Sequence, residues 1–80
     1  MEYPLKNPQQ LGAVLQGLRR ERRLTQAAAG AKVGLAQNAV SMLETNPTNA
    51  SLARVFKLLS ALELEIVVRD RRKRSETSKW

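Results

Sequence analysis

The segment QAAAGAKVGLAQNAVSMLET, residues 26–45, constrains the fold more than any other part of the chain. Gly34 permits the positive φ that ends one helix before another begins. Gly30 has no side chain, so two helix backbones can approach closely there. The apolar contacts around this turn are expected from Ala29, Val33, Leu35, Val40 and Leu43. The spacing predicts short helices over about 26–33 and 36–44, held at a steep angle across a tight turn.

Another helix is predicted before this pair. Asn7 can cap it, Pro8 suits its first position, and Gln10 stands where a capping-box partner belongs. The apolar residues that follow at helical spacing are Leu11, Val14, Leu15 and Leu18. The helix should span about 8–22. Its polar face and far end carry Arg19, Arg20, Arg22 and Arg23. Arg19, Arg20 and Arg22 are interpreted either as partner contacts or as a solvated face of the helix. The acidic residues Glu21 and Glu44 are interpreted as capping or surface residues.

Further helix signals follow from Thr25 onwards. Thr25 caps the helix that opens the central segment, and the turn formers NPTN at 46–49 stop its second helix. Ser51 then caps a fourth helix. Its apolar positions at helical spacing are Leu52, Val55, Phe56, Leu59 and Leu62. The side chains expected in the core include Leu18, Val40, Leu43, Val55 and Phe56.

Residues 64–69 change to a period of two. Leu64, Ile66 and Val68 alternate with the residues between them, which is typical of a β-strand. A lone strand cannot satisfy its own backbone groups, and no second strand is evident in the sequence. We therefore expect this strand to pair with its copy in a homodimer.

Composition excludes several classes of protein. The chain has 80 residues with no cysteine and no histidine, so disulfides are impossible and a zinc site is disfavoured. No metal or cofactor is expected. The thin core of so short a chain favours burial against a second subunit. No apolar run is long enough for a signal peptide or a membrane span, which favours a cytoplasmic protein without a membrane partner.

The charge is strongly basic and unevenly distributed. Fourteen Lys and Arg against seven Asp and Glu give a net charge of +7, which favours nucleic acid as a partner. Six of the basic residues and two of the acidic ones lie in residues 69–80. Residues 71–80 are predicted to be a flexible basic tail. A tail that merely aids solubility is the alternative interpretation.

At this point LTQAAAGAKVGLAQNAVSMLE resembles the XRE-type helix-turn-helix repressors, a family that includes the phage repressors and Cro. The resemblance extends over about 8–62. It implies a mostly α, compact, lambda-repressor-like domain of four to five helices. The chain departs from the pattern at Ala29, where leucine is usual, at Gly30, where alanine is usual, and at Ala36, which lacks a capping hydroxyl.

The resemblance implies roles in reading double-stranded DNA. The third helix would lie in the major groove, where the Gln37 amide can bond adenine bidentately. The accompanying base contacts are expected from Asn38, Ser41 and Met42. Gln26 would anchor a phosphate and brace Gln37, and the other backbone contacts are expected from Arg23, Lys32 and Lys57. Alternatively, Gln37 is an ordinary exposed polar residue.

The run NPTNASLARVFKLLSALELEIVV, with a basic tail ending in tryptophan, narrows the resemblance to HipB-type antitoxins. That resemblance implies a dimer with paired C-terminal strands that represses its own operon. It also implies neutralisation of a HipA-type serine/threonine kinase, with Trp80 as a candidate anchor in that partner. Trp80 as a chance terminal residue is the alternative.

The predicted organisation has four parts. They are an N-terminal arm (1–7), a DNA-binding domain (8–63), a dimerisation strand (64–70) and the basic tail (71–80). No paired carboxylates, activated nucleophile or phosphate-binding glycine loop indicates an enzyme. A stand-alone XRE-type repressor and a partner-sequestering module without DNA function remain alternatives, although the polar start of the third helix disfavours the second. Sequence-blind RNA binding lacks the stacking aromatic residues that such sites favour.

Overall fold

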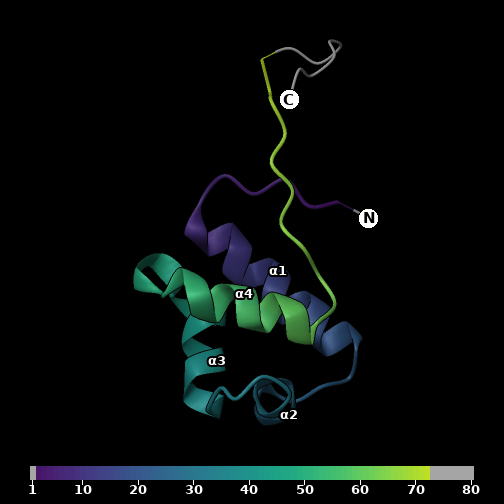
Figure 1. Cartoon of the computed structure of the whole chain (residues 1–80), viewed down its shortest axis with the longest axis vertical. Coiled ribbons are helices and arrows are strands. Elements are labelled where there is room, and N and C mark those ends of the chain that lie inside the picture. Colours follow the sequence, from purple (N-terminus) through teal and green to yellow (C-terminus); the bar gives the residue numbers. More distant parts are fainter. Residues whose placement is uncertain (1, 73–80) are drawn as a thin grey trace.

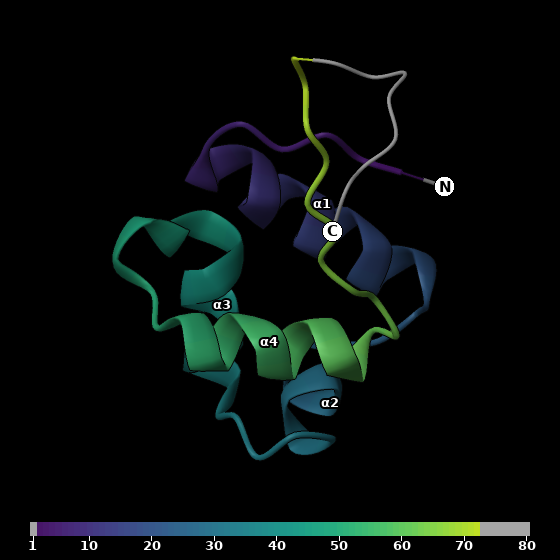
Figure 2. The ribbon, with the colours of Figure 1, turned by 45° about the horizontal axis from the view of Figure 1, so that its top comes forward.

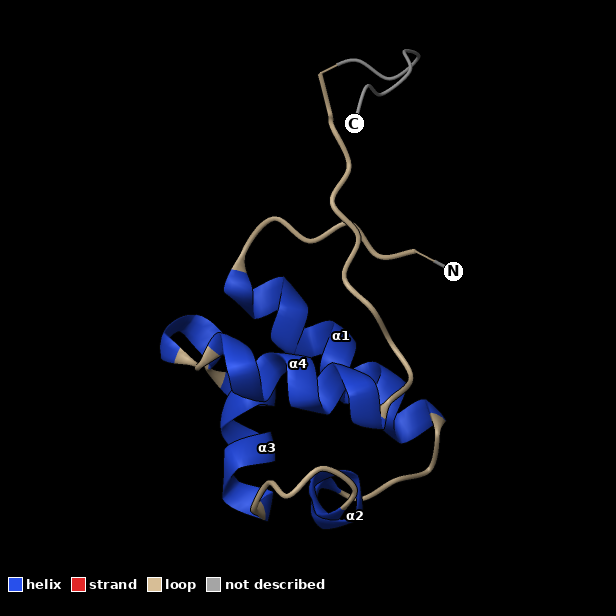
Figure 3. Ribbon diagram, in the orientation of Figure 1, coloured by secondary structure: helices blue, strands red, loops and turns tan. Residues whose placement is uncertain are grey.

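A computed structural model describes residues 2–72 of the chain. Within them the chain forms the helices α1 (Pro8–Glu21), α2 (Gln26–Ala31), α3 (Gln37–Thr45) and α4 (Leu52–Ala61), with the short 3-10 helix η1 (Pro47–Asn49) before α4. Helix α3 packs against both α1 and α2, and α4 also contacts α2 (Figure 1). The described part contains helices and loops without a strand (Figure 3). The mostly helical fold expected from the sequence is confirmed.

Side-chain caps begin three of the helices, as predicted. The cap hydrogen bonds run from Gln10 N–H to Asn7 Oδ1 (2.9 Å), from Ala28 N–H to Thr25 Oγ1 (3.0 Å) and from Arg54 N–H to Ser51 Oγ (3.4 Å). Helix α3 starts without such a cap because Ala36 has no hydroxyl. The Gln10 side chain accepts from the N–H of Lys6 at 2.6 Å, one residue earlier than a capping box predicts.

One apolar cluster forms the core between the helices. Its buried members are Leu15, Ala29, Leu35, Val40, Leu43, Val55, Leu58, Leu59 and Leu62. The prediction that Phe56 belongs to the core is wrong, because its side chain is 51% exposed. The buried face of α4 consists of Val55, Leu58 and Leu59, and the Phe56 side chain projects beside that face. Leu58, which is fully buried, lies in the core where Phe56 was expected.

Two glycines hold the helix pair together as predicted. Gly34 has φ +74°, which ends α2 and turns the chain towards α3. A Cβ on Gly30 would collide with the carbonyl oxygen of Leu35 and lie 3.0 Å from Val40 Cγ2. The close approach of α2 to the start of the next helix therefore requires glycine at position 30.

The chain after α4 leaves the helical body (Figures 1 and 2). Leu64 is half-buried, whereas Ile66, Val67 and Val68 are exposed and irregular rather than a strand. An ion pair of 3.0 Å between Arg69 and Glu2 ties this segment to the N-terminal arm. Since a strand needs a neighbouring strand, pairing with a second copy stays a prediction. No helix in the described range is long and apolar enough to cross a membrane.

Candidate nucleic-acid interface

The start of α3 presents polar side chains to solvent. Gln37 and Asn38 are exposed, Met42 is 56% exposed, and Ser41 is half-buried. The opposite face of the helix packs into the core through Val40 and Leu43. The structure therefore brings the four predicted base-contacting residues to one accessible side of the same helix.

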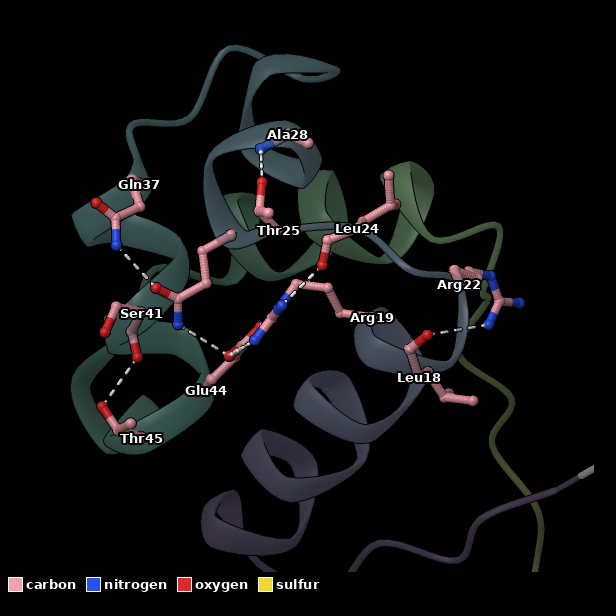
Figure 4. Close-up of polar contacts among 11 residues, drawn as sticks. Leu18, Arg19, Arg22, Leu24, Thr25, Ala28, Gln37, Ser41, Glu44 and Thr45 are labelled. Carbon is pink, nitrogen blue, oxygen red and sulfur yellow. Dashed lines mark hydrogen bonds and ion pairs between the residues drawn. The ribbon is translucent and has the colours of Figure 1, made fainter.

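Gln26, the first residue of α2, reaches across to Gln37. Gln37 Nε2 donates to Gln26 Oε1 at 2.9 Å (Figure 4). The contact expected between these two glutamines is present, and it joins the first turns of α2 and α3. It limits the rotation of the Gln37 side chain before any ligand arrives.

A buried ion pair lies behind these glutamines. Arg19 Nε donates to Glu44 Oε2 at 2.6 Å, and Arg19 Nη2 donates to Glu44 Oε1 at 3.1 Å. The Arg19 side chain is 9% exposed and that of Glu44 is 0% exposed. The interpretations of Glu44 as a surface residue and of Arg19 as part of a solvated face are wrong, whereas Arg20 is exposed.

The ion pair and the glutamines form one continuous network. Gln26 Nε2 donates to Glu44 Oε1 at 3.1 Å, so the network runs from Arg19 through Glu44 and Gln26 to Gln37 (Figure 4). Arg19 Nη1 also donates to the carbonyl oxygen of Leu24 at 2.8 Å. No buried side-chain polar atom in the described range lacks a hydrogen-bond partner.

The network keeps both ends of the ion pair charged. Burial alone would raise the pKa of Glu44, but hydrogen bonds from Arg19, Gln26 and Gln16, together with the charge of Arg19, lower it below its ordinary value. The hydrogen bond to Glu44 is the main cause that raises the pKa of Arg19. Glu44 is therefore a carboxylate at neutral pH.

The Arg19–Glu44 pair was not predicted, although helical spacing carries a signal for it. Arg19 follows the core residue Leu15 by four positions, and Glu44 follows Val40 by four. Each charge therefore lies on the buried face of its helix. Two opposite charges on buried faces are expected to form an ion pair, because an unpaired buried charge is strongly unfavourable.

The cations predicted to contact a DNA backbone lie at three places. Arg23 follows α1 with φ +58°, Lys32 caps the end of α2, and Lys57 is on α4. All three side chains are exposed and make no ion pair within residues 2–72. No group of three or more acidic side chains that could hold a metal occurs in the same range. Trp80 lies outside the described residues.

Comparison with known proteins defines the family. Residues 15–68 match the helix-turn-helix family model. Antitoxin HipB of Escherichia coli K12 is 33% identical over 72 residues, which cover 90% of this chain and 82% of that protein. The chain belongs to the HipB antitoxin family of helix-turn-helix proteins. HipB of E. coli O6:H1 (strain CFT073) is 36% identical over 64 residues, which cover 80% of this chain and 68% of that protein.

Solved HipB structures share the whole fold. The HipB chain of a HipB–O4 20mer complex superposes with a TM-score of 0.84 at 31% identity, covering 89% of this chain and 100% of that one. A HipA–HipB–O2–O3 complex gives the same TM-score, identity and coverage. The resemblance drawn from the sequence to XRE-type and HipB-type proteins is confirmed. Membership of this antitoxin family also agrees with the prediction that the chain is not an enzyme.

Proposed function

We propose that the protein is the antitoxin of a toxin–antitoxin operon. It acts as a homodimeric repressor that binds palindromic operator DNA and neutralises a HipA-type serine/threonine kinase. The observation that carries the DNA-binding function is the Gln37 amide, exposed at the start of α3 and braced by Gln26. The HipB–O4 20mer complex, which we read as a complex with operator DNA, supports it.

Each residue on this face has a role in the proposal. Gln37 reads a base edge at the front of the major groove, and the residues that accompany it are Asn38, Ser41 and Met42. Gln26 binds a phosphate while it holds Gln37. The cations that neutralise further phosphates are Arg23, Lys32 and Lys57, all of them exposed.

The proposal assigns the remaining segments to protein partners. Residues 64–70 pair with the same residues of a second copy, with Leu64, Ile66 and Val68 as the strand's alternating apolar positions. Residues 71–80 contact the kinase, and Trp80 anchors the tail in a pocket of it. The HipA–HipB–O2–O3 complex supports an assembly that contains toxin, antitoxin and operator together. Such a regulator acts in the bacterial cytoplasm, on the nucleoid when it is bound to its operator.

The DNA function is tested at Gln37. Gln37→Ala should cost about 1–3 kcal/mol on a palindromic duplex selected with the wild-type protein and little on random duplex, because a base contact carries discrimination. Lys32→Ala is the control: it should weaken both duplexes and reduce the salt dependence of binding. Fluorescence anisotropy titrations would measure both. Equal losses on the two duplexes for Gln37→Ala would remove Gln37 from base readout.

The antitoxin function is tested at the tail. The tagged full chain, purified from its native cell, should co-elute with a HipA-type kinase. Removal of residues 71–80 should abolish that co-elution while specific DNA binding survives, weakened by the loss of positive charge. Trp80→Ala should reproduce much of the loss. Specific DNA binding by a protein that co-elutes with no kinase would instead support the alternative, a stand-alone XRE-type repressor.

A further inference from the structure

We propose that Glu44 sets the direction of the Gln37 amide and thereby makes the recognition helix prefer adenine over guanine. This inference rests on the proposed reading of base edges by Gln37. Glu44 is a positioning residue in it, because its side chain is fully buried behind Gln26 and does not reach the exposed face of α3. Side-chain hydrogen bonds connect the ion pair through Gln26 to Gln37 (Figure 4).

The carboxylate of Glu44 can only accept hydrogen bonds. Ionised Glu44 has two acceptor oxygens and no proton to donate. Both oxygens already accept hydrogen bonds from Arg19, at 2.6 and 3.1 Å. Any further group that bonds to Glu44 must therefore present an N–H or O–H to it.

The acceptor atoms of Glu44 fix the orientation of the Gln26 amide. Its amide has a donor end and an acceptor end, and only the donor end can face Glu44. Gln26 Nε2 lies 3.1 Å from Glu44 Oε1 as this requires. The acceptor end of the amide, Gln26 Oε1, is then turned towards Gln37.

The orientation of Gln26 in turn fixes that of the Gln37 amide. Facing an acceptor, it must donate, and its Nε2 lies 2.9 Å from Gln26 Oε1. Gln37 is left with one free N–H and a free carbonyl oxygen. Adenine offers the matching pair in the major groove, an N7 acceptor and an N6 donor.

Reversing the network would reverse this preference. If Gln26 donated to the carbonyl oxygen of Gln37, both N–H groups of Gln37 would be free. Two donors match the N7 and O6 acceptors of guanine. An ion pair that only stabilised the helices would allow either direction of the hydrogen bond between Gln26 and Gln37. A carboxylate at position 44 excludes the direction in which Gln26 donates to Gln37.

The test compares binding to two duplexes. One is the selected palindrome, and the other carries G·C in place of A·T at the base pair whose preference Gln37→Ala abolishes. The wild-type protein should prefer the adenine duplex by about tenfold or more. Glu44→Gln, which keeps the shape and can still accept from Arg19, should bring the ratio within about threefold, because an amide at position 44 can bond Gln26 in either direction.

A double variant separates direction from stability. In Gln26→Glu/Glu44→Gln the carboxylate is moved to position 26, where it accepts from both neighbours and again forces Gln37 to donate. The adenine preference should return to about tenfold even though the buried charge next to Arg19 is gone and total affinity falls. A purely structural role for Glu44 predicts no such recovery.

The outcomes are distinguishable. A folded Glu44→Gln with an undiminished adenine ratio, or a double variant that behaves like Glu44→Gln, overturns the inference. Should Glu44→Gln fail to fold, Gln26→Met retains the ion pair but breaks the link to Gln37, and an undiminished ratio in that variant overturns the inference equally. If every base preference of the wild-type protein were retained in Gln37→Ala, the proposed base readout by Gln37, on which the inference rests, would itself be wrong.

Discussion

At the scale of single residues, the buried Arg19–Glu44 ion pair carries a large desolvation cost. Removing two charges from water is costly, and their attraction offsets this only when the geometry is good and the remaining polar atoms are bonded. Here Gln26 and the carbonyl oxygen of Leu24 supply the additional hydrogen bonds. The pair therefore joins α1 to α3 without leaving either of its side chains unsatisfied. Loss of either partner would leave the other as an unpaired buried charge.

The free energy of unfolding should fall at acidic pH because Glu44 becomes protonated there. The pKa of Glu44 is lower in the folded chain than in the unfolded one, so the unfolded state binds the proton more readily. The stabilisation is fully present above the ordinary glutamate pKa of about 4.3 and is lost as pH falls through the lower folded value. Urea denaturation below about pH 5 should show the free energy of unfolding falling with pH.

Glu44→Gln should lower stability at neutral pH and flatten that acid dependence. Glu65→Gln, a change on the exposed segment after α4, is the matched control and should leave the slope unchanged. An acid slope that persisted undiminished in Glu44→Gln would mean that other carboxylates cause it.

At the scale of the elements, glycines decide how closely the helices pack. A Cβ on Gly12 of α1 would collide with the carbonyl oxygen of Glu44 on α3, just as a Cβ on Gly30 would collide with Leu35. Gly17, also in α1, has nothing within 4 Å of such a Cβ. The first two glycines are therefore packing positions, whereas the third only lowers the helix propensity of α1.

Alanine substitutions at Gly17 and Gly30 should therefore change the free energy of unfolding in opposite directions. Gly17→Ala should stabilise the fold by about 0.5–1 kcal/mol through helix propensity. Gly30→Ala should destabilise it by about 1–3 kcal/mol, because the methyl group meets backbone that cannot move aside cheaply. Urea denaturation of the two variants measures both effects. A stabilising Gly30→Ala would show that α2 can shift away from Leu35 at little cost.

At the scale of the whole molecule, much apolar surface stays in water in the single chain. Val67 is 72% and Val68 92% exposed after α4, and Leu52 and Phe56 are exposed on α4 itself. A core supplied by four short helices is thin, so covering such surface on a second copy would add burial that the monomer lacks. The proposed strand pairing would cover the segment after α4.

Ile66→Pro tests that pairing. Proline removes an amide donor and restricts φ, so a strand paired across a dimer should fail at this position. Sedimentation at micromolar concentration should show more monomer than the wild-type protein. Ile66→Val, which keeps the amide and the β-branch, should remain dimeric. An unchanged dimer in Ile66→Pro would place the interface on α4, where Leu52 and Phe56 are exposed.

The local part of this structure was determined by the sequence alone. Thr25 and Ser51 start helices because their hydroxyls cap the neighbouring N–H groups, and Gly34 ends one because it tolerates positive φ. These signals act over a few residues, so they can be read without knowledge of packing. The motif they frame resembles the helix-turn-helix family, and that resemblance implied the contact between Gln26 and Gln37.

Only the tertiary structure decided which side chains are buried. Helical spacing can place Arg19 and Glu44 on the buried faces of their helices, but the two residues are 25 positions apart, and only the packing of α1 on α3 brings their charges together. Phe56 fits the helical spacing of a core residue, yet the rotation of α4 on its neighbours buries Leu58 in its place. Residues 64–69 have a strand pattern, but backbone pairing needs a second strand that residues 2–72 do not supply. Burial and pairing depend on which surfaces meet, and that is a property of the assembled helices and not of any segment.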